Sequence, residues 1–567
     1  MYHMKKILLL LFSLFSLNIF SQEWQWAKSA SGTATEVAQL STVDTAGNLY
    51  VIGSFETNTI YFDSILIINP GPSSCNFLVK YDMNGNAIWA KAFKLNNYGN
   101  SINSMCHDQA GNIFFAGTFY HDSVTFGNYV LRNDSANDAK MFIVKMKADG
   151  DVVWAIQADK QSEQYISSIS SDAAGNVYAI GGFKGSQAIF GSDTLSGSAG
   201  WAQNQFHLKV SPNGSFSWAK KIEGSLSPTS SWYFGFSEIT SDDYGNTYLA
   251  GHFRDTVLII EGDTLLNSSY ASQTFVLKYD PSGNFQWSAN IAPSYRYITD
   301  IHCDAAGQIY LTGTFNIPSI TIGTSVLTGC GTTQYSELYL AKLDQNGNIL
   351  WARTPDGNHC DHQPAMLQTD NNSNVYLAGN YDGYIRFGND TLRALDPPPH
   401  SKFFVAGFDP SGTPLFAKGV GAESYDIVSS LSIDKMNNLY VTGGFNSDSV
   451  KFDGMTLINS YFEDEFQNLS DIFVAKLDLN NVSITEYGDL SHLKIFPNPS
   501  SCGLINIESN LGPDCKCRVS NMLGQTIVNK TISQHDILDL SGLDKGVYFI
   551  ELTNRKNDRV IQKVILQ

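Results

Sequence analysis

Asp44-Thr-Ala-Gly-Asn-Leu-Tyr-Val-Ile-Gly-Ser-Phe55 is the stretch of sequence that decides the fold. Its pattern, Asp-x-x-Gly-Asn-x-Tyr-x-x-Gly-x-Phe, occurs seven times with some substitutions, at steps of 64, 64, 70, 62, 66 and 64 residues. The copies begin at Asp44, Asp108, Asp172, Asp242, Asp304, Asp370 and Asp434. A long repeat that is rich in turn and aromatic residues and lacks helical periodicity predicts an all-β chain of stacked sheets.

Each copy predicts a tight turn between two strands. The Asp side chain can bond its own turn backbone, and Gly tolerates the positive φ that such a turn requires. Ser373 and Asn437 replace this Gly in the sixth and seventh copies. Because Asn tolerates left-handed geometry, we expect the seventh copy to keep the turn and the sixth to turn differently. A second Gly, Gly53 in the first copy, lies inside the following strand and indicates a bulge or the close approach of a neighbouring sheet.

A second hairpin follows each copy, so that every repeat predicts four strands. In the first repeat it runs from Phe77-Leu-Val-Lys80 to the strand around Trp89. Four strands in two hairpins are one blade of a β-propeller. The strand before the Asp has a Ser-rich face, with Ser167, Ser168, Ser170 and Ser171 in the third copy, which we expect near a crowded central channel.

The two ends of the repeat region complement each other. The last repeat lacks its Trp strand and has Val482-Ser-Ile-Thr instead, whereas Trp26-Ala-Lys28 near the N-terminus matches Trp89-Ala-Lys91. We therefore predict an all-β fold: a seven-bladed β-propeller closed by the N-terminal strand, followed by a small Ig-like β-sandwich. Closure of this kind removes exposed sheet edges. The repeats also resemble those of secreted bacterial propellers rich in Asp-x-x-Gly-Asn-x-Tyr.

The two termini predict export. Lys5, Lys6 and the apolar run Ile7 to Phe20 are typical of a signal peptide that ends at residue 21 and is too short for a membrane anchor. We expect the propeller over residues 22–480, a linker over 481–492 and a separate domain over 493–567. No other segment is apolar enough to span a bilayer.

The C-terminal domain contains four ordered motifs: Pro497-Asn-Pro499, Leu523-Gly-Gln525, Gly546-Val-Tyr-Phe549 and Lys563-Val-Ile565. Together they resemble the sorting domain of the type IX secretion system of Bacteroidetes. The resemblance implies the type IX machinery as a partner and a protein that is secreted or attached to the outer-membrane surface. An ordinary Ig-like binding module is the alternative.

Net charge and residue spacing limit the partners and metals that the chain can bind, and the cysteines allow disulfide bonds. The net charge of −18 argues against nucleic acid, since phosphate binding needs a clustered basic surface. The repeated Asp residues supply too few oxygens for calcium, and His359-Cys-Asp-His362 has no second cluster with zinc spacing, so we expect no metal and no cofactor. Cys502 could bridge to Cys515 or Cys517, and Cys330 to Cys360.

Function is expected in the stretches that do not repeat, because loops held by a rigid scaffold carry binding residues. The proposed ligand contacts are aromatic loop residues and one Arg: Trp232, Tyr233, Tyr295, Arg296, Tyr297, Tyr461 and Phe462. We expect a monomeric binding or adhesion module for a glycan or protein. A propeller hydrolase or lyase acting on polysaccharide or peptide is the alternative, and a purely structural surface component is a third. Two convergent carboxylates in the channel would favour the enzyme.

Overall fold

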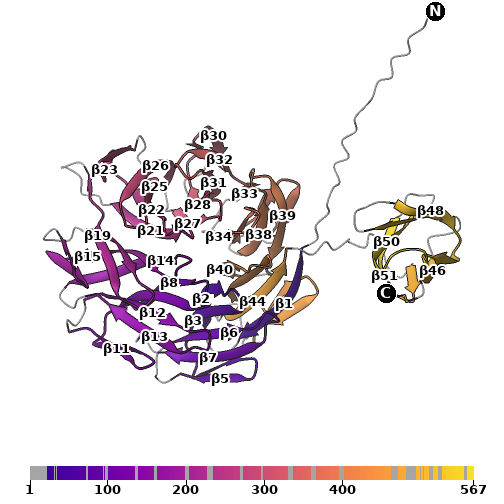
Figure 1. Ribbon diagram of the computed structural model, residues 1–567, viewed down its shortest axis with the longest axis horizontal. Coiled ribbons are helices and arrows are strands. Elements are labelled where there is room, and N and C mark those ends of the chain that lie inside the picture. Colours follow the sequence, from indigo (N-terminus) through magenta and orange to yellow (C-terminus); the bar gives the residue numbers. More distant parts are fainter. Residues whose placement is uncertain are drawn as a thin grey trace, which may run out of the picture. The chain divides into compact units, whose positions relative to one another are not determined.

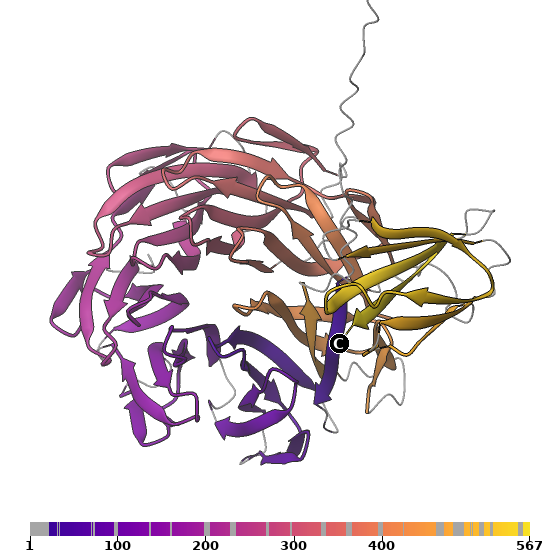
Figure 2. The same cartoon turned by 45° about the vertical axis from the view of Figure 1, so that its right-hand side comes forward.

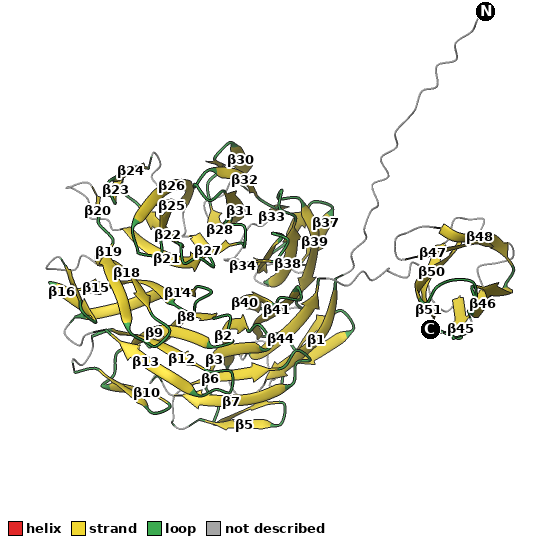
Figure 3. Cartoon of the chain, viewed as in Figure 1, coloured by secondary structure: helices red, strands yellow, loops and turns green. Residues whose placement is uncertain are grey.

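The computed structural model describes part of the chain, which forms two compact units: Trp24–Asp478, and Leu479–Gln567 together with Met1–Glu23. The described residues are 22–30, 32, 35–69, 71, 74–93, 95, 100–134, 138–158, 162–197, 204–226, 234–267, 272–294, 298–329, 336–358, 366–394, 401–422, 424–460, 470–479, 493–498, 500–501, 503–509, 515–521, 526–553 and 559–566. Within them every regular element is a β-strand, which confirms the all-β prediction (Figure 3).

Seven four-stranded antiparallel sheets make up the described part of the first unit. From the first strand outward, the first three sheets are β2 (Glu36–Val43), β3 (Leu49–Phe55), β6 (Cys75–Tyr81) and β7 (Ala87–Phe93); β8 (Ser101–His107), β9 (Ile113–Phe119), β12 (Lys140–Met146) and β13 (Val152–Gln157); and β14 (Glu163–Ser171), β15 (Val177–Lys184), β18 (Asn204–Val210) and β19 (Phe216–Lys221). The next three are β21 (Phe234–Ser241), β22 (Thr247–Phe253), β25 (Ser272–Tyr279) and β26 (Phe285–Ser294); β27 (Ile298–Cys303), β28 (Ile309–Phe315), β31 (Glu337–Leu343) and β32 (Ile349–Arg353); and β34 (Met366–Thr369), β35 (Val375–Tyr381), β38 (Lys402–Phe408) and β39 (Pro414–Val420).

The seventh sheet joins the two ends of this unit. It consists of β40 (Asp426–Ile433), β41 (Asn438–Phe445), β44 (Asp471–Asp478) and, at its outer edge, the N-terminal strand β1 (Glu23–Ala30). The indigo β1 accordingly lies beside the orange β44 (Figure 1). Hydrogen bonds also connect this sheet to the first one: Ser41 Oγ lies 2.9 Å from Ser430 Oγ and 2.8 Å from Ser432 Oγ.

Every sheet carries an additional two-stranded hairpin between its second and third strands. The hairpins are β4 (Thr59–Phe62) with β5 (Ile65–Ile68), β10 (Ser123–Phe126) with β11 (Tyr129–Arg132), β16 (Gln187–Phe190) with β17 (Asp193–Ser196), β23 (Val257–Ile260) with β24 (Asp263–Leu266), β29 (Ser319–Ile322) with β30 (Ser325–Thr328), β36 (Tyr384–Phe387) with β37 (Asp390–Arg393), and β42 (Ser449–Phe452) with β43 (Met455–Ile458). Two short strands extend two of these hairpins to three strands: β20 (Gly224–Leu226) pairs with β23, and β33 (Asp356–Asn358) pairs with β36.

The repeated Asp organises the turn as its sequence predicts. Asp44 Oδ1 accepts hydrogen bonds from Ala46 N and Asn48 N, both at 2.9 Å, and Tyr50 donates its hydroxyl to Asp44 Oδ2 at 3.0 Å. The expectation that the sixth copy turns differently is wrong. Ser373 adopts φ 61 and donates its N–H to Asp370 O at 3.0 Å, which is the bond that Gly47 makes to Asp44 O. The side-chain and backbone bonds of Asp370 hold a serine in left-handed geometry.

The second Gly of the repeat marks a bulge in the neighbouring strand. A Cβ at Gly53 would lie 2.1 Å from Val37 O and 2.4 Å from Phe77 Cζ, so no other residue fits there without movement. Opposite it, the register of β2 shifts between Ala38 and Leu40. The bulge prediction is therefore confirmed, and the close approach comes from within the same sheet.

The C-terminal part consists of two antiparallel sheets with a common core. One contains β45 (Leu493–Phe496), β46 (Leu504–Ser509) and β49 (His535–Asp539), and the other β48 (Thr526–Ile532), β47 (Cys515–Asn521), β50 (Gly546–Thr553) and β51 (Arg559–Leu566). Ile507, Val519 and Ile550 are fully or almost fully buried between them. Figure 2 shows the twist of these strands. Cys517 is a buried free thiol, which is inconsistent with its predicted bridge to Cys502; Cys502, Cys330 and Cys360 lie outside the described residues.

Candidate functional site

The ligand contacts predicted from the loops lie outside the described residues. This holds for all seven of them: Trp232, Tyr233, Tyr295, Arg296, Tyr297, Tyr461 and Phe462. The cluster His359 to His362 lies outside as well, as do residues 1–21. The candidate site among the described residues lies elsewhere, where the first strands of the sheets meet.

The first strands of all seven sheets line a central cavity of about 440 Å³. These strands, β2, β8, β14, β21, β27, β34 and β40, surround the middle of the unit (Figure 1), and β40 contacts β2. The polar side chains of the lining are Ser41, Thr42, Asn103, Ser104, His107, Ser168, Ser170, Ser171, Glu238, Thr240, Ser241, Thr299, Asp300, His302, Gln368, Ser429, Ser430 and Ser432. Of the four Ser residues predicted near a central channel, Ser168, Ser170 and Ser171 line this cavity, and Ser167 is not among its lining residues.

Two carboxyl groups from neighbouring sheets face this cavity. Glu238 lies on β21 and Asp300 on β27, and both occupy the position four residues before the repeated Asp. Burial, followed by repulsion from Asp300, raises the pKa of Glu238 to about 8. Burial likewise raises the pKa of Asp300 to about 7, although two backbone amides partly oppose it. Near neutral pH this pair therefore holds protons that ordinary carboxyl groups have lost.

Hydrogen bonds fix both carboxyl groups to the adjacent sheets. Ser168 Oγ on β14 donates to Glu238 Oε2 at 2.8 Å. Asp300 Oδ2 accepts from Leu367 N on β34 at 2.9 Å, and Asp300 Oδ1 from Ile301 N at 2.8 Å. Both groups therefore keep their orientation, and each also links two sheets.

Two imidazole rings complete the polar lining. His107 Nδ1 lies 2.9 Å from Thr42 Oγ1, and His302 Nδ1 lies 3.0 Å from Thr369 Oγ1, in each case across a sheet boundary. Burial lowers the pKa of His107 and lowers that of His302 to about 4. Both rings are therefore neutral near pH 7, like most of the cavity wall.

The cavity offers hydrogen bonds with little fixed charge. Hydroxyl, amide, imidazole and protonated carboxyl groups can each donate and accept, which matches the hydroxyl groups of a sugar. Within the described part of the chain, no group of three or more His, Cys, Asp or Glu side chains is placed to hold a metal ion. The same carboxyl pair has pKa values suited to proton transfer near neutral pH.

Sequence reasoning missed Glu238 and Asp300, although a signal was present. In the other five copies the position four residues before the repeated Asp is occupied by a Ser or an uncharged, apolar residue: Leu40, Ser104, Ser168, Met366 and Ser430. Acidic residues at a strand position that otherwise faces a channel depart from the repeat. Comparing the copies column by column would have identified them.

Comparison with known proteins identifies the C-terminal domain. Residues 494–567 match the family described as secretion system C-terminal sorting domain. This confirms the predicted sorting domain, implies engagement of the type IX machinery, and makes the protein secreted or attached to the outer-membrane surface. No helix among the described residues has the length and apolar character needed to cross a membrane.

Similarity to curated proteins is weaker. The chain is 22% identical over 448 residues to the uncharacterized WD repeat-containing protein L264 of Acanthamoeba polyphaga mimivirus, with 66% of this chain and 32% of that protein covered. The chain thus spans about a third of the length of this curated relative. An all-β, propeller-like fold agrees with this similarity.

Several solved structures are similar at low identity. An ulvan lyase of polysaccharide lyase family PL25, bound to -[GlcA(1-4)Rha3S]-, is 10% identical with a TM-score of 0.41, covering 75% of this chain and 93% of the lyase. The gluconolactonase XC5397 from Xanthomonas campestris is 11% identical with a TM-score of 0.29, covering 71% and 90%. At these TM-scores neither structure supports a conclusion about activity.

Proposed function

We propose that this protein is an exported binding module, a seven-bladed β-propeller whose central cavity holds a neutral glycan. The observation that carries the proposal is the lining of that cavity, where hydroxyl groups surround the carboxyl groups of Glu238 and Asp300, whose pKa values burial raises. The aromatic loop residues, including Trp232, Tyr295 and Tyr461, are proposed as further contacts. We propose residues 1–21 as a signal peptide, 22–480 as the propeller, 481–492 as a linker and 493–567 as the sorting domain.

Contacts that recur between sheets support a closed propeller. Trp89 Nε1 donates to Ala148 O in the second sheet at 3.2 Å. Trp154, Trp218, Trp287 and Trp351 make the same bond to the sheet that follows, at 3.0 to 3.4 Å. Trp26, on the strand at the edge of the seventh sheet, donates to Met83 O in the first sheet at 3.1 Å. The contact that joins successive sheets is thus also present between the last sheet and the first.

The character of the cavity supports a neutral ligand. Among the described residues that line it, Glu238 and Asp300 are the only acidic ones and none is Lys or Arg. An anionic sugar would therefore bring its charge into the cavity without a cation to pair with, at a high desolvation cost. A neutral oligosaccharide exchanges hydrogen bonds with water for hydrogen bonds with the wall and so avoids this cost.

A glycan-array screen of the purified protein tests this proposal. We expect binding to neutral oligosaccharides, and weaker binding after Glu238→Leu, which removes the hydrogen-bonding head from the wall. Glu238→Gln should bind like the wild type, because its amide keeps one donor and one acceptor there. A protein that binds no array glycan, or that binds one unchanged after Glu238→Leu, would contradict the proposal.

A second candidate function, an acid–base enzyme acting on extracellular polysaccharide, is favoured by the carboxyl pair itself. A carboxyl whose pKa is raised towards 7 beside a second carboxyl is what a general acid requires. The two functions are separated by one variant, Glu238→Gln, which keeps hydrogen bonding but cannot transfer a proton. Release of reducing ends by the wild type and its loss in Glu238→Gln, with binding retained, would establish the enzyme.

A further inference from the structure

Each sheet of the first unit has one apolar residue near the end of its last strand, and in several sheets this residue packs in a buried cluster of the sheet that follows. This residue, four positions after the conserved Trp or Phe of the last strand, is here called the plug residue. The seven plug residues are Ala30, Phe93, Ala158, Ile222, Ile291, Pro355 and Val420. Ile291, for example, belongs to one buried cluster with Leu311 and Ile322 of the next sheet. Phe93 stacks on Phe115 with its ring centroid at 5.9 Å.

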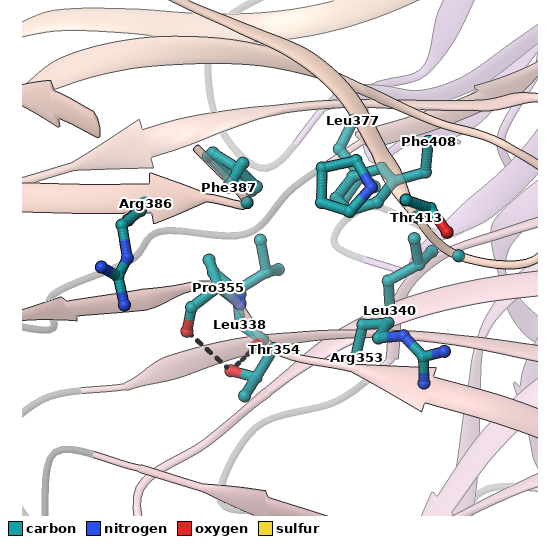
Figure 4. A pocket seen from close by; sticks show the side chains of 13 residues that line it. Leu338, Leu340, Arg353, Thr354, Pro355, Leu377, Arg386, Phe387, Phe408 and Thr413 are labelled. Carbon is teal, nitrogen blue, oxygen red and sulfur yellow. Dashed lines mark hydrogen bonds between the residues drawn. The ribbon is translucent and has the colours of Figure 1, made fainter. Parts of the chain in front are cut away.

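The plug between the fifth and sixth sheets is Pro355, and a pocket of about 240 Å³ is present there (Figure 4). The pocket lies among five apolar side chains that are 4% exposed or less: Leu338, Leu340, Leu377, Phe387 and Phe408. Its volume corresponds to roughly eight water molecules in the liquid. A pocket of about 560 Å³ occupies the equivalent place beside Phe93, between the first and second sheets, so the space belongs to the sheet boundary and is not created by the proline alone.

The backbone is adapted to this proline. In the third sheet the plug residue Ile222 donates its N–H to Gln205 O at 3.0 Å. Pro355 has no N–H, and the matching carbonyl, Leu338 O, accepts the Thr354 hydroxyl at 2.8 Å instead (Figure 4). The Thr354 hydroxyl thus replaces the missing N–H, so the Leu338 carbonyl beside the pocket keeps a hydrogen-bond donor.

Within the described part of the chain, a cation at the rim of the pocket also lacks the acidic partner that three of its counterparts have. Two positions after the conserved Trp or Phe, Lys28, Lys91 and Lys418 form ion pairs with Asp63, Asp151 and Asp453 at 3.6, 3.8 and 3.0 Å. Arg353 occupies the same position in the fifth sheet, where Gly388 and Thr413 replace those acidic residues. Its guanidinium donates to Ala352 O at 2.9 Å and to Ser411 O at 3.3 Å, and lies 5.5 Å from the Trp351 ring.

The second arginine at the rim is already neutralised. Arg386 on β36 forms an ion pair with Asp356 on β33. Arg353 and Arg386 lie on opposite sides of the apolar side chains (Figure 4). The rim therefore carries one positive charge without a carboxylate among the described residues, beside an apolar cavity.

We propose that this pocket binds a small amphiphilic carboxylate, with its apolar body between the fifth and sixth sheets and its carboxylate on Arg353. Transfer of the apolar body from water drives the binding. The guanidinium donates a charge-assisted hydrogen bond to the carboxylate, as the Lys418 ammonium does to Asp453. The site is separate from the central cavity, so its occupancy does not depend on the function proposed there.

Calorimetric titration of the full chain tests the proposal with three probes: octanoate, 3-phenylpropionate and octan-1-ol. We expect octanoate to bind at least tenfold more tightly than octan-1-ol, because the alcohol lacks the charge that pairs with Arg353. The aromatic acid tells whether the pocket prefers a linear or a planar body. Absence of saturable binding of both acids at millimolar concentration would overturn the proposal.

Two variants reproduce what other repeats already contain. Gly388→Asp restores an acidic partner for Arg353 at φ +59, close to the φ of 50 and 51 that Asp63 and Asp453 adopt. It should weaken octanoate binding at least tenfold and leave octan-1-ol unaffected. Pro355→Ile installs the plug residue of the third and fourth sheets and should abolish binding of all probes.

The matched control is Gly127→Asp, the same substitution at the equivalent hairpin of the second sheet, where φ is +57. It should leave every affinity unchanged. If Gly388→Asp binds octanoate as tightly as the wild type, Arg353 does not hold the carboxylate and the proposal is wrong. Unchanged binding after Pro355→Ile would place the ligand elsewhere.

Discussion

Ser168 donates its hydroxyl to Glu238 Oε2 at 2.8 Å, and the two residues belong to the first strands of adjacent sheets. This bond alone does not keep Glu238 ionised, since burial and the charge of Asp300 raise its pKa to about 8. The folded protein therefore binds protons that the unfolded chain releases between pH 4.5 and 8.

The first prediction concerns the pH dependence of stability. Where the native state binds more protons than the unfolded state, the free energy of unfolding falls as pH rises. We expect the melting temperature of the wild type to decrease between pH 7 and 8.5, where Glu238 and Asp300 lose their protons. Below pH 7 the buried histidines, whose pKa values burial lowers, act in the opposite direction. Glu238→Gln, which cannot ionise, should show a smaller decrease. Parallel curves for the two proteins, measured by calorimetry, would contradict the raised pKa.

The second prediction concerns the repeated Asp. Asp172 accepts four bonds: from Ala174 N at 3.0 Å, from Asn176 N at 2.9 Å, from Asn176 Nδ2 at 2.7 Å and from the Tyr178 hydroxyl at 3.1 Å. Asp172→Ala leaves these donors, among them the buried Tyr178 hydroxyl, without their acceptor and should cost about 3 kcal/mol in urea unfolding.

Asp304 provides the comparison for that substitution. It accepts from Ala306 N and Gln308 N, both at 2.9 Å, while Tyr310 donates to Ser373 O instead. Asp304→Ala should therefore cost about half as much as Asp172→Ala. Equal costs would show that the side-chain bonds of Asn176 and Tyr178 contribute little.

Much of this architecture could be predicted because its turns and strands depend on short-range interactions that recur in every repeat. Turns set by Asp44 and Gly47, and the strand marked by Trp89, need only neighbouring residues to be recognised. The carboxyl pair was missed because Glu238 and Asp300 are 62 residues apart and become neighbours only when sheets are stacked. The pocket beside Pro355 was missed for the same reason, since a pocket between two sheets depends on side chains from both sheets.

The third prediction tests closure by the N-terminal strand. Trp26 and Trp218 are both half-buried, and each donates its indole N–H to the next sheet, at 3.1 and 3.4 Å. If β1 completes the seventh blade, Trp26→Ala should lower the free energy of unfolding about as much as Trp218→Ala, by about 3 kcal/mol. A neutral Trp26→Ala beside a destabilising Trp218→Ala would show that β1 is dispensable.

The fourth prediction concerns export. Removing residues 494–567, the segment that matches the sorting domain, should leave the protein inside the cell. Immunoblots of medium, surface and cell fractions measure this, and nearly all of the truncated protein should be retained. Asp304→Ala in the full chain controls for a mild loss of stability and should still be exported. Normal export of the truncated chain would contradict the role of the tail.

The central claim is that the cavity between the seven first strands binds a neutral glycan, and direct titration of Glu238 variants tests it most closely. Using the best neutral oligosaccharide from the array, we predict similar dissociation constants for the wild type and Glu238→Gln, and at least tenfold weaker binding for Glu238→Leu. A dissociation constant that is the same in all three proteins would contradict the account, because it would place the ligand outside the cavity.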